Sequence, residues 1–212
     1  MFFSYSFITA AFSVIVVISN VISAKLFLLP IFDSFAIPAG LITYPITFLL
    51  SDLMTELYGQ EQAKQMIRTA LLLSVLCFGI IEIALMLPAS HPEIQTSFET
   101  VLGINGWIVL GSLTAFLIAQ SMDVYLYALI KKWTGEPLLW LRNNGSTLLS
   151  QIVDTIAVNW IYLFFGLGMG HEEIAQIALF SYIYKALFSV ALTPVFYLLV
   201  SLGKRYNHSY AA

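Results

Sequence analysis

Charged residues are scarce in this sequence. They make up 10% of the 212 positions, whereas hydrophobic residues make up 59%. A soluble domain needs a far more charged surface, and long apolar runs separated by turn signals are typical of a polytopic helical membrane protein. The first run begins almost at Met1, with no basic segment before it and no small-residue cleavage site after it. We therefore expect a retained membrane helix there, not a signal peptide.

Cysteine and histidine are also rare. The single cysteine, Cys77, lies inside an apolar run, which argues against a disulfide framework and a thiolate metal site. None of the three histidines lies within an apolar run. The sequence contains no phosphate-binding glycine-rich loop, no zinc-type cluster and no basic tract for nucleic acid. We therefore expect no cofactor, no metal and no nucleic-acid partner.

Six apolar runs are long enough to cross a bilayer as helices, for which about 20 residues are needed. The predicted fold class is all-α, a polytopic membrane protein in which residues 1–212 form a single transmembrane domain of six helices. Pro38 and Pro45 bracket a stretch that either breaks the second helix, as at transporter binding sites, or lies in an ordinary membrane helix. The runs cover residues 4–26, 36–58, 66–88, 104–130, 146–168 and 176–201.

The connections between these runs alternate in charge. The second and fourth connections and the segment after the sixth run are basic, whereas the first, third and fifth connections contain no lysine or arginine. Because basic connections stay in the cytoplasm, we expect both termini to be cytoplasmic, in the lipid bilayer of a bacterial cytoplasmic (inner) membrane. The basic residues in or next to these connections are Lys64, Arg68, Lys131, Lys132, Arg142, Lys204 and Arg205.

Several ionisable residues lie inside the predicted helices. Each costs at least about 2.5 to 3.5 kcal/mol on insertion scales, so we expect them to face one another or a water-filled cavity. Asp52 and Glu56 are four positions apart and share one helical face. Asp52, Asp123 and Asp154 are expected in one layer in the cytoplasmic half. The remaining ionisable residues are expected in the middle or outer half and are Lys25, Glu82, which has no assigned role, and Lys185.

The fourth and fifth runs contain the same short unit, a small residue and a glutamine followed by an aspartate. It occurs as Ala119-Gln120-x-x-Asp123 and as Ser150-Gln151-x-x-Asp154. Glutamine and aspartate three positions apart project to one face, so each helix presents an amide beside a carboxylate. The unit is either a chance match or an inverted repeat of the kind that forms midplane sites in transporters.

An ordered series of motifs runs from Ser19 to Thr155, within a resemblance that covers the chain from about Ser19 to the last helix. It comprises Ser19-Asn20 with Lys25, Pro38-Ala39-Gly40, Tyr44-Pro45, Ser51-Asp52-x-x-x-Glu56-x-Tyr58-Gly59, Gln120-x-x-Asp123, Trp140-Leu141-Arg142-Asn143, Ser146-Thr147 and Ser150-Gln151-x-x-Asp154-Thr155. This series resembles the queuosine precursor transporter family, six-helix members of the vitamin-uptake-like transporters. Tyr44 stands where that family is expected to have phenylalanine. The resemblance implies uptake of free 7-deazaguanine bases, such as queuine, preQ0 or preQ1, for tRNA modification.

The polar residues suit such a purine-like substrate. A carboxylate accepts the adjacent N1–H and N2–H₂ donors of a deazaguanine as it accepts an arginine fork, and the carbonyl oxygen requires a donor. The planar ring can stack on Tyr44, Tyr125 or Tyr162. The candidate substrate-binding residues are Asn20, Lys25, Tyr44, Asp52, Glu56, Gln120, Asp123, Arg142, Gln151, Asp154 and Lys185.

Structural roles are open for the same residues. Asp52 and Glu56 can balance charge at the inner interface or pair with Lys64. Asp123 and Asp154 can form fixed ion pairs with Arg142 or Lys131 that hold the bundle together. Lys25 can extend to the outer headgroups, Ser146 can cap the start of a helix, and Arg142 can serve as a positive-inside signal or in gating.

Three classes of function fit these observations. The favoured one is a secondary transporter, not an enzyme, whose ion coupling and oligomeric state the residues do not specify. The second is a substrate-binding subunit that needs an energising ATPase module. The third is a membrane-embedded enzyme with an acid/base dyad formed by two of Asp52, Asp123 and Asp154. None of these acids lies in the Gly-x-Gly-Asp context of intramembrane aspartyl proteases, which counts against the third class.

Overall fold

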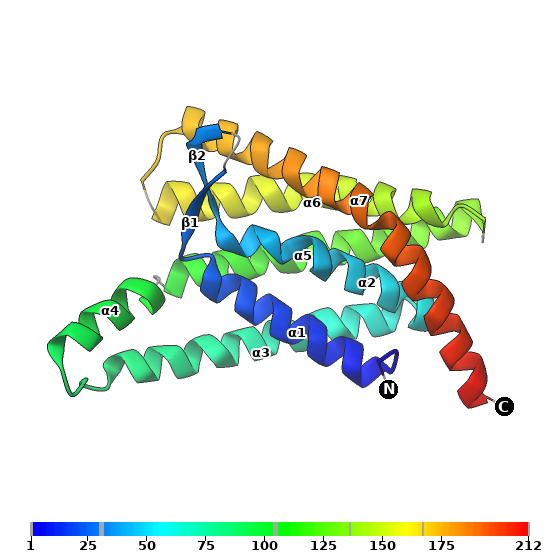
Figure 1. Ribbon diagram of the computed structural model, residues 1–212, viewed down its shortest axis with the longest axis horizontal. Helices are drawn as coiled ribbons and strands as arrows, with labels where there is room; N and C mark the ends of the chain where they lie inside the picture. Colours follow the sequence, from blue (N-terminus) through cyan, green and yellow to red (C-terminus); the bar gives the residue numbers. More distant parts are fainter. Residues whose placement is uncertain (1, 30–31, 104–105, 136, 167, 212) are drawn as a thin grey trace.

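The apolar runs of the sequence form long helices, as a computed structural model of the protein shows (Figure 1). The structure describes residues 2–29, 32–103, 106–135, 137–166 and 168–211. The α-helices in this part of the chain are α1 (Tyr5–Ile22), α2 (Tyr44–Tyr58), α3 (Gln60–Met86), α4 (Pro92–Leu102), α5 (Gly106–Thr134), α6 (Leu139–Asn159) and α7 (His171–Ala211). The other elements are the strands β1 (Leu26–Leu29) and β2 (Phe32–Pro38), the 3-10 helix η1 (Ala39–Ile42) and the π-helix η2 (Trp160–Gly166).

Five helical segments of the described chain are long and apolar enough to cross a membrane. They are Tyr5–Ile22, Gln60–Met86, Gly111–Thr134, Leu139–Phe165 and His171–Tyr206. The protein is therefore a multi-pass membrane protein. Helix α2 is not among these segments, because its 15 residues rise only about 22 Å, less than the hydrocarbon core of about 30 Å.

The expected continuous helix over residues 36–58 is wrong in its first part. Residues 36–38 end strand β2, which pairs antiparallel with β1, and α2 begins only at Tyr44 after η1. Pro45 lies in the first turn of α2, where the missing N–H leaves no helical hydrogen bond unmade. Gly40 lies so close to α1 that an added Cβ would meet the Ser19 carbonyl oxygen. The segment bracketed by the two prolines is therefore a break before a short helix.

Two connections also differ from expectation. The acidic segment 89–103 contains helix α4. Helix α6 begins at Leu139, directly after Pro137 and Leu138, so Ser146 is a buried residue inside the helix and the predicted N-cap at Ser146 is wrong. Gly145 lies inside α6 and does not end it. A Cβ at this position would come within 3.2 Å of Ile130 Cδ1, so the missing side chain lets α6 pack closely on α5.

Helix α2 occupies the centre of the bundle and packs against α1, α3, α5, α6 and α7. Most of its residues from Pro45 to Glu56 are buried. Figure 1 shows both chain termini at one end of the bundle, together with the end of α2 and the α5–α6 connection; the strands, α4 and the start of α7 lie at the other end. The basic connections of the sequence thus gather at the end with the termini, while the orientation of that end in a membrane stays a prediction.

Candidate functional site

Buried polar side chains form three levels along the central helix α2. We name them from the start of α2: the pocket level at Tyr44 and Thr47, the middle level at Ser51 and Asp52, and the terminal level at Glu56. Each level is completed by side chains from α5, α6 or α7. Because α6 runs antiparallel to α2, its residues meet these levels in reverse order, with Asp154 first and Arg142 last.

The pocket level contains a buried ion pair between α6 and α7. Lys185 Nζ lies 2.8 Å from Oδ2 of Asp154 and 3.2 Å from Oγ1 of Thr155. The hydroxyl of Tyr44 donates to Oδ1 of Asp154 at 2.6 Å, and Lys185 Nζ lies 4.3 Å from the centre of the Tyr44 ring. Asp154 and Lys185 are almost completely buried. Residues of three helices therefore hold a positive and a negative charge side by side.

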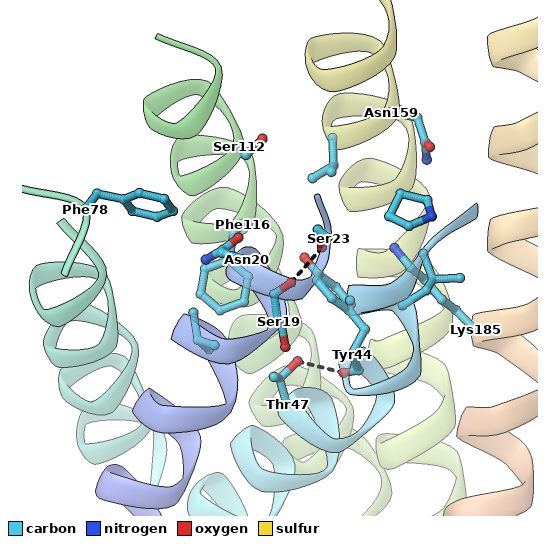
Figure 2. Close-up of a pocket in the computed structure, with 15 residues that line it drawn as sticks. Ser19, Asn20, Ser23, Tyr44, Thr47, Phe78, Ser112, Phe116, Asn159 and Lys185 are labelled. Atoms are coloured by element: carbon cyan, nitrogen blue, oxygen red, sulfur yellow. Dashed lines mark hydrogen bonds between the residues drawn. The ribbon is translucent and has the colours of Figure 1, made fainter. Parts of the chain in front are cut away.

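A cavity of about 100 Å³ adjoins this ion pair. Figure 2 shows Lys185 and Tyr44 on one side of it and Phe78, from α3, on the other. Of the predicted residues, Asn20, Tyr44 and Lys185 line the cavity. The rest of the lining consists of Val16, Ser19, Ser23, Pro38, Gly40, Leu41, Thr47, Phe78, Ser112, Phe116, Val158 and Asn159.

Several of these lining residues were not among the sequence candidates. Asn159 had a usable signal, an amide within an apolar run, and its side chain donates to the Thr155 carbonyl at 2.7 Å. Phe78 and Phe116 had none, because they resemble the many lipid-facing aromatic residues. Gln120 lies next to the cavity, where Nε2 donates to Thr47 Oγ1 at 3.4 Å.

The middle level holds two neighbouring carboxyl groups, those of Asp52 and Asp123. Both residues are completely buried. Ser150 donates to Oδ1 of Asp123 at 3.0 Å, and Ser51 donates to Oδ2 at 3.3 Å. Thr147 donates to Oδ2 of Asp52 at 3.4 Å. The expectation that Asp123 can form an ion pair with Arg142 or Lys131 is wrong, because both cations bind Glu56 instead.

The terminal level is a cluster of cations around Glu56. Its carboxylate lies 2.9 Å from Arg142 Nη2, 3.0 Å from Lys131 Nζ and 3.0 Å from Lys204 Nζ. Tyr127 also donates to it at 3.0 Å. The pairing of Asp52 or Glu56 with Lys64 is wrong, since Lys64 pairs with its own neighbour on α3, Glu61. Arg142 is 1% exposed, so it is a buried ion-pair partner and not a surface charge.

The expected single layer of three acids is also wrong. Asp154 lies four residues beyond Ser150 on α6, which places it about 6 Å along the helix from the Asp123 contact. None of the candidate acids Asp52, Glu56, Asp123 and Asp154 lines the cavity, and neither do Gln120, Gln151 and Arg142. The candidates therefore divide between levels instead of surrounding one ligand.

Some candidates lie away from the cavity altogether. Lys25 is exposed, because α1 ends at Ile22 and Lys25 follows in the turn toward β1. Tyr125 is 57% exposed, and the side chain of Tyr162 lies outside the described residues. Gln151 is fully buried, yet within the described chain neither atom of its amide has a hydrogen-bond partner. Glu82 is exposed on α3.

Comparison with known proteins gives consistent matches. The model of a protein family described as "Putative vitamin uptake transporter" matches residues 38–199. A Bacillus subtilis protein named "Probable queuosine precursor transporter" is 38% identical over 121 residues, which are 55% of this chain and 52% of that protein. The matched region thus spans about half the length of that relative. A Haemophilus influenzae protein of the same name is 23% identical over 205 residues, covering 90% of this chain and 80% of that protein. No solved structure matches.

Proposed function

We propose that this chain, which belongs to the vitamin uptake transporter family, imports queuosine precursors of the 7-deazaguanine class across the bacterial cytoplasmic membrane. The transporter role rests on the family, and the choice of substrate rests on the relatives' names and on the chemistry of the pocket level. The observation that carries the proposal is the Tyr44, Asp154 and Lys185 arrangement beside a cavity with aromatic walls.

The substrate edge and the pocket level have complementary donors and acceptors. A deazaguanine presents a carbonyl oxygen next to N1–H and N2–H₂ on one edge. Lys185 can donate to the carbonyl in a charge-assisted hydrogen bond, while Asp154, which does not itself line the cavity, holds Lys185 and the Tyr44 hydroxyl in place from behind. The amides of Asn20 and Asn159 supply further donors and acceptors to the same cavity.

The aromatic lining suits the flat faces of the base. Phe78 and Phe116 come from α3 and α5, on the side of the cavity away from Lys185. Aromatic side chains contribute apolar area and stacking geometry to a planar ring. A site with such paired polar groups discriminates strongly against analogues that lack the matching group, because buried partners would be left unsatisfied.

We further propose that α2, with the strands and η1 before it, forms the second of six membrane passes. The described residues contain five apolar segments long enough to cross the bilayer. Helix α2 lies at the centre of the bundle and is long enough to cross only part of the bilayer thickness. Short helices preceded by irregular backbone are used at transporter binding sites because the irregular part is enclosed by protein. The first residues of α2, including Tyr44, lie at such a place.

Uptake of a labelled free deazaguanine base tests this function directly. The host should lack both its own transporter and its own synthesis of the precursor. We expect cells that produce this protein to accumulate label in tRNA at low external concentration, and we expect excess guanine to compete weakly. The exposed pair of Lys64 and Glu61 offers a control, since Lys64→Gln should leave uptake unchanged. Label entering no faster than in cells without the protein would refute the substrate assignment, whereas uptake only with a co-produced ATPase module would make the chain a binding subunit.

A further inference from the structure

Among the described residues, Asp52 and Asp123 are the buried acids that no cation balances. They come from α2 and α5, are completely buried and lie close together. Ser51, the neighbour of Asp52, donates to Asp123, while Thr147 and Ser150 on one turn of α6 donate to Asp52 and Asp123. The other two buried acids have cations: Asp154 has Lys185, and Glu56 has Arg142, Lys131 and Lys204. Among the described residues, no lysine, arginine or histidine forms an ion pair with Asp52 or Asp123. Two carboxylates placed so close in a low-dielectric interior cannot both be ionised without a bound positive charge.

The surroundings of the pair supply oxygen atoms and no cation. On α2 the nearest ionisable neighbour is Glu56, another acid, and on α5 it is Tyr127, a neutral phenol. On α6, Asp154 and Arg142 are committed to other partners, as are Lys185 and Lys204 on α7. The buried face of helix α3 carries apolar residues and Ser74, and its charged residues Glu61, Lys64, Arg68 and Glu82 are exposed or half-buried. Within the part of the chain that the structure describes, no neighbouring element therefore neutralises the pair.

Unpartnered buried oxygen atoms at this place are a second, independent observation. Thr147 donates to Oδ2 of Asp52, but Oδ1 has no hydrogen-bond partner within the described residues. The carbonyl oxygen Oε1 of Gln120, one helical turn before Asp123 and on the amide that donates to Thr47, is likewise buried and unpartnered within the described residues. Buried polar atoms are normally satisfied, and an exception calls for an explanation such as a bound ion or water. Carboxylate, hydroxyl and amide oxygens are the ligands that hard cations bind.

We propose that the middle level is a coupling site, in which Asp52 and Asp123 together hold one exchangeable monovalent cation, either a proton or Na⁺. The cation is bound and released once in each transport cycle, and its gradient drives the concentration of cargo. This inference rests on the proposed transport function, but it assigns the pair to the cation and not to the cargo. A group of three or more His, Cys, Asp or Glu side chains suited to a larger metal ion is not found among the described residues.

The position of the middle level connects it to both of its neighbours. Ser51 and Asp52 lie about two helical turns from Tyr44 on α2, and Ser150 lies one turn from Asp154 on α6. A change of charge at the pair therefore acts on the same two helices that hold the pocket level. Because neither acid lines the cavity, cation and cargo can be bound at the same time.

Transport in proteoliposomes tests the coupling. A tenfold inward gradient of the coupled cation, at one cation per neutral cargo, supports about tenfold accumulation of cargo. We expect either a pH gradient or a Na⁺ gradient to produce this accumulation with the wild type. In Asp52→Asn and Asp123→Asn, the ratio of gradient-driven accumulation to cargo counterflow should fall from a value of about 10 to a value of about 1. Counterflow without accumulation under either gradient in the wild type would overturn the coupling site, whereas absence of any counterflow would refute the proposed cargo.

Two measurements on the purified protein do not depend on the cargo. If the cation is a proton, the wild type at neutral pH should show the infrared absorption of a protonated carboxyl group, and this band should be absent from Asp52→Asn and Asp123→Asn. If it is Na⁺, NaCl should raise the unfolding temperature by a few degrees relative to choline chloride, with the rise lost in the same variants. Asp154→Asn is the control, because it alters the pocket level and should preserve whichever signal is found. A wild type with neither signal would overturn the proposal, even where one variant fails to fold.

Discussion

Arg142 and Glu56 lie 86 positions apart in the chain, yet Nη2 of Arg142 is 2.9 Å from Oε1 of Glu56 across the α6–α2 contact. Both side chains are almost fully buried, at 1% and 0% exposure. Lys131 from α5 and Lys204 from α7 bind the same carboxylate but are partly exposed. One acid at the end of α2 therefore joins four helices at the end of the bundle that holds the termini.

Removing the charge of Glu56 should destabilise the protein strongly. Glu56→Gln removes the carboxylate that Arg142 contacts in the interior, and loss of one member of a buried ion pair costs about 3–5 kcal/mol. Removal of a partly exposed cation should cost less, so we expect at most about 1 kcal/mol for Lys204→Gln. Denaturant unfolding in detergent measures both. An effect of Lys204→Gln as large as that of Glu56→Gln would contradict a cluster centred on the buried pair with Arg142.

The hydroxyl of Tyr44 should contribute to cargo binding through Asp154. Tyr44→Phe keeps the ring beside Lys185 but removes the donor that holds the carboxylate. A hydrogen bond of this kind contributes about 1–1.5 kcal/mol, so the KM for uptake should rise about tenfold. Tyr182→Phe is the matched control on α7, since its hydroxyl donates to the Leu148 carbonyl outside the cavity. Equal effects of the two substitutions would show that Tyr44 has only a structural role.

The close approach of η1 to α1 should make Gly40 sensitive to any side chain. In Gly40→Ala the new methyl group would meet the Ser19 carbonyl oxygen and the Ser23 hydroxyl, and a backbone atom cannot move away easily. We expect a loss of stability of about 1–3 kcal/mol together with weaker uptake, because Gly40 lines the cavity. Gly79→Ala provides the contrast, since a Cβ there meets nothing within 4 Å and alanine favours the helix. Equal stability of the two variants would contradict the observed contact.

The predicted orientation can be tested with single cysteines. Cys77→Ser first removes the one native thiol. In intact cells, Ser97→Cys on α4 should react with a membrane-impermeant thiol reagent, and Gln62→Cys at the start of α3 should react only after permeabilisation. Both positions are exposed in the structure, so burial does not explain a difference. Labelling in the reverse order would place the termini outside and refute the positive-inside interpretation.

The positions of the buried ionisable residues within their apolar runs could be read from the sequence. The membrane class follows from composition alone. A helix that crosses the lipid core must form all its backbone hydrogen bonds internally, and it must present apolar side chains to the lipid. Lys185, Asp154 and Asp52 stand inside such runs, where an ionisable group must find a partner, so their importance was predictable. The family resemblance added the expected substrate, and the comparisons confirm the family.

Which of these residues meet was decided only by the tertiary structure. Helical periodicity specifies the face on which Asp52, Asp123 and Asp154 lie, but not the rotation and axial offset of one helix against another. Those offsets pair Asp154 with Lys185, leave Asp52 with Asp123, and bring Glu56 to Arg142. The start of α2 at Tyr44 is also a tertiary result, because Gly40 must approach α1 before the helix begins. Local sequence thus determined which groups must be buried, and the packing of helices distant in the chain determined their partners.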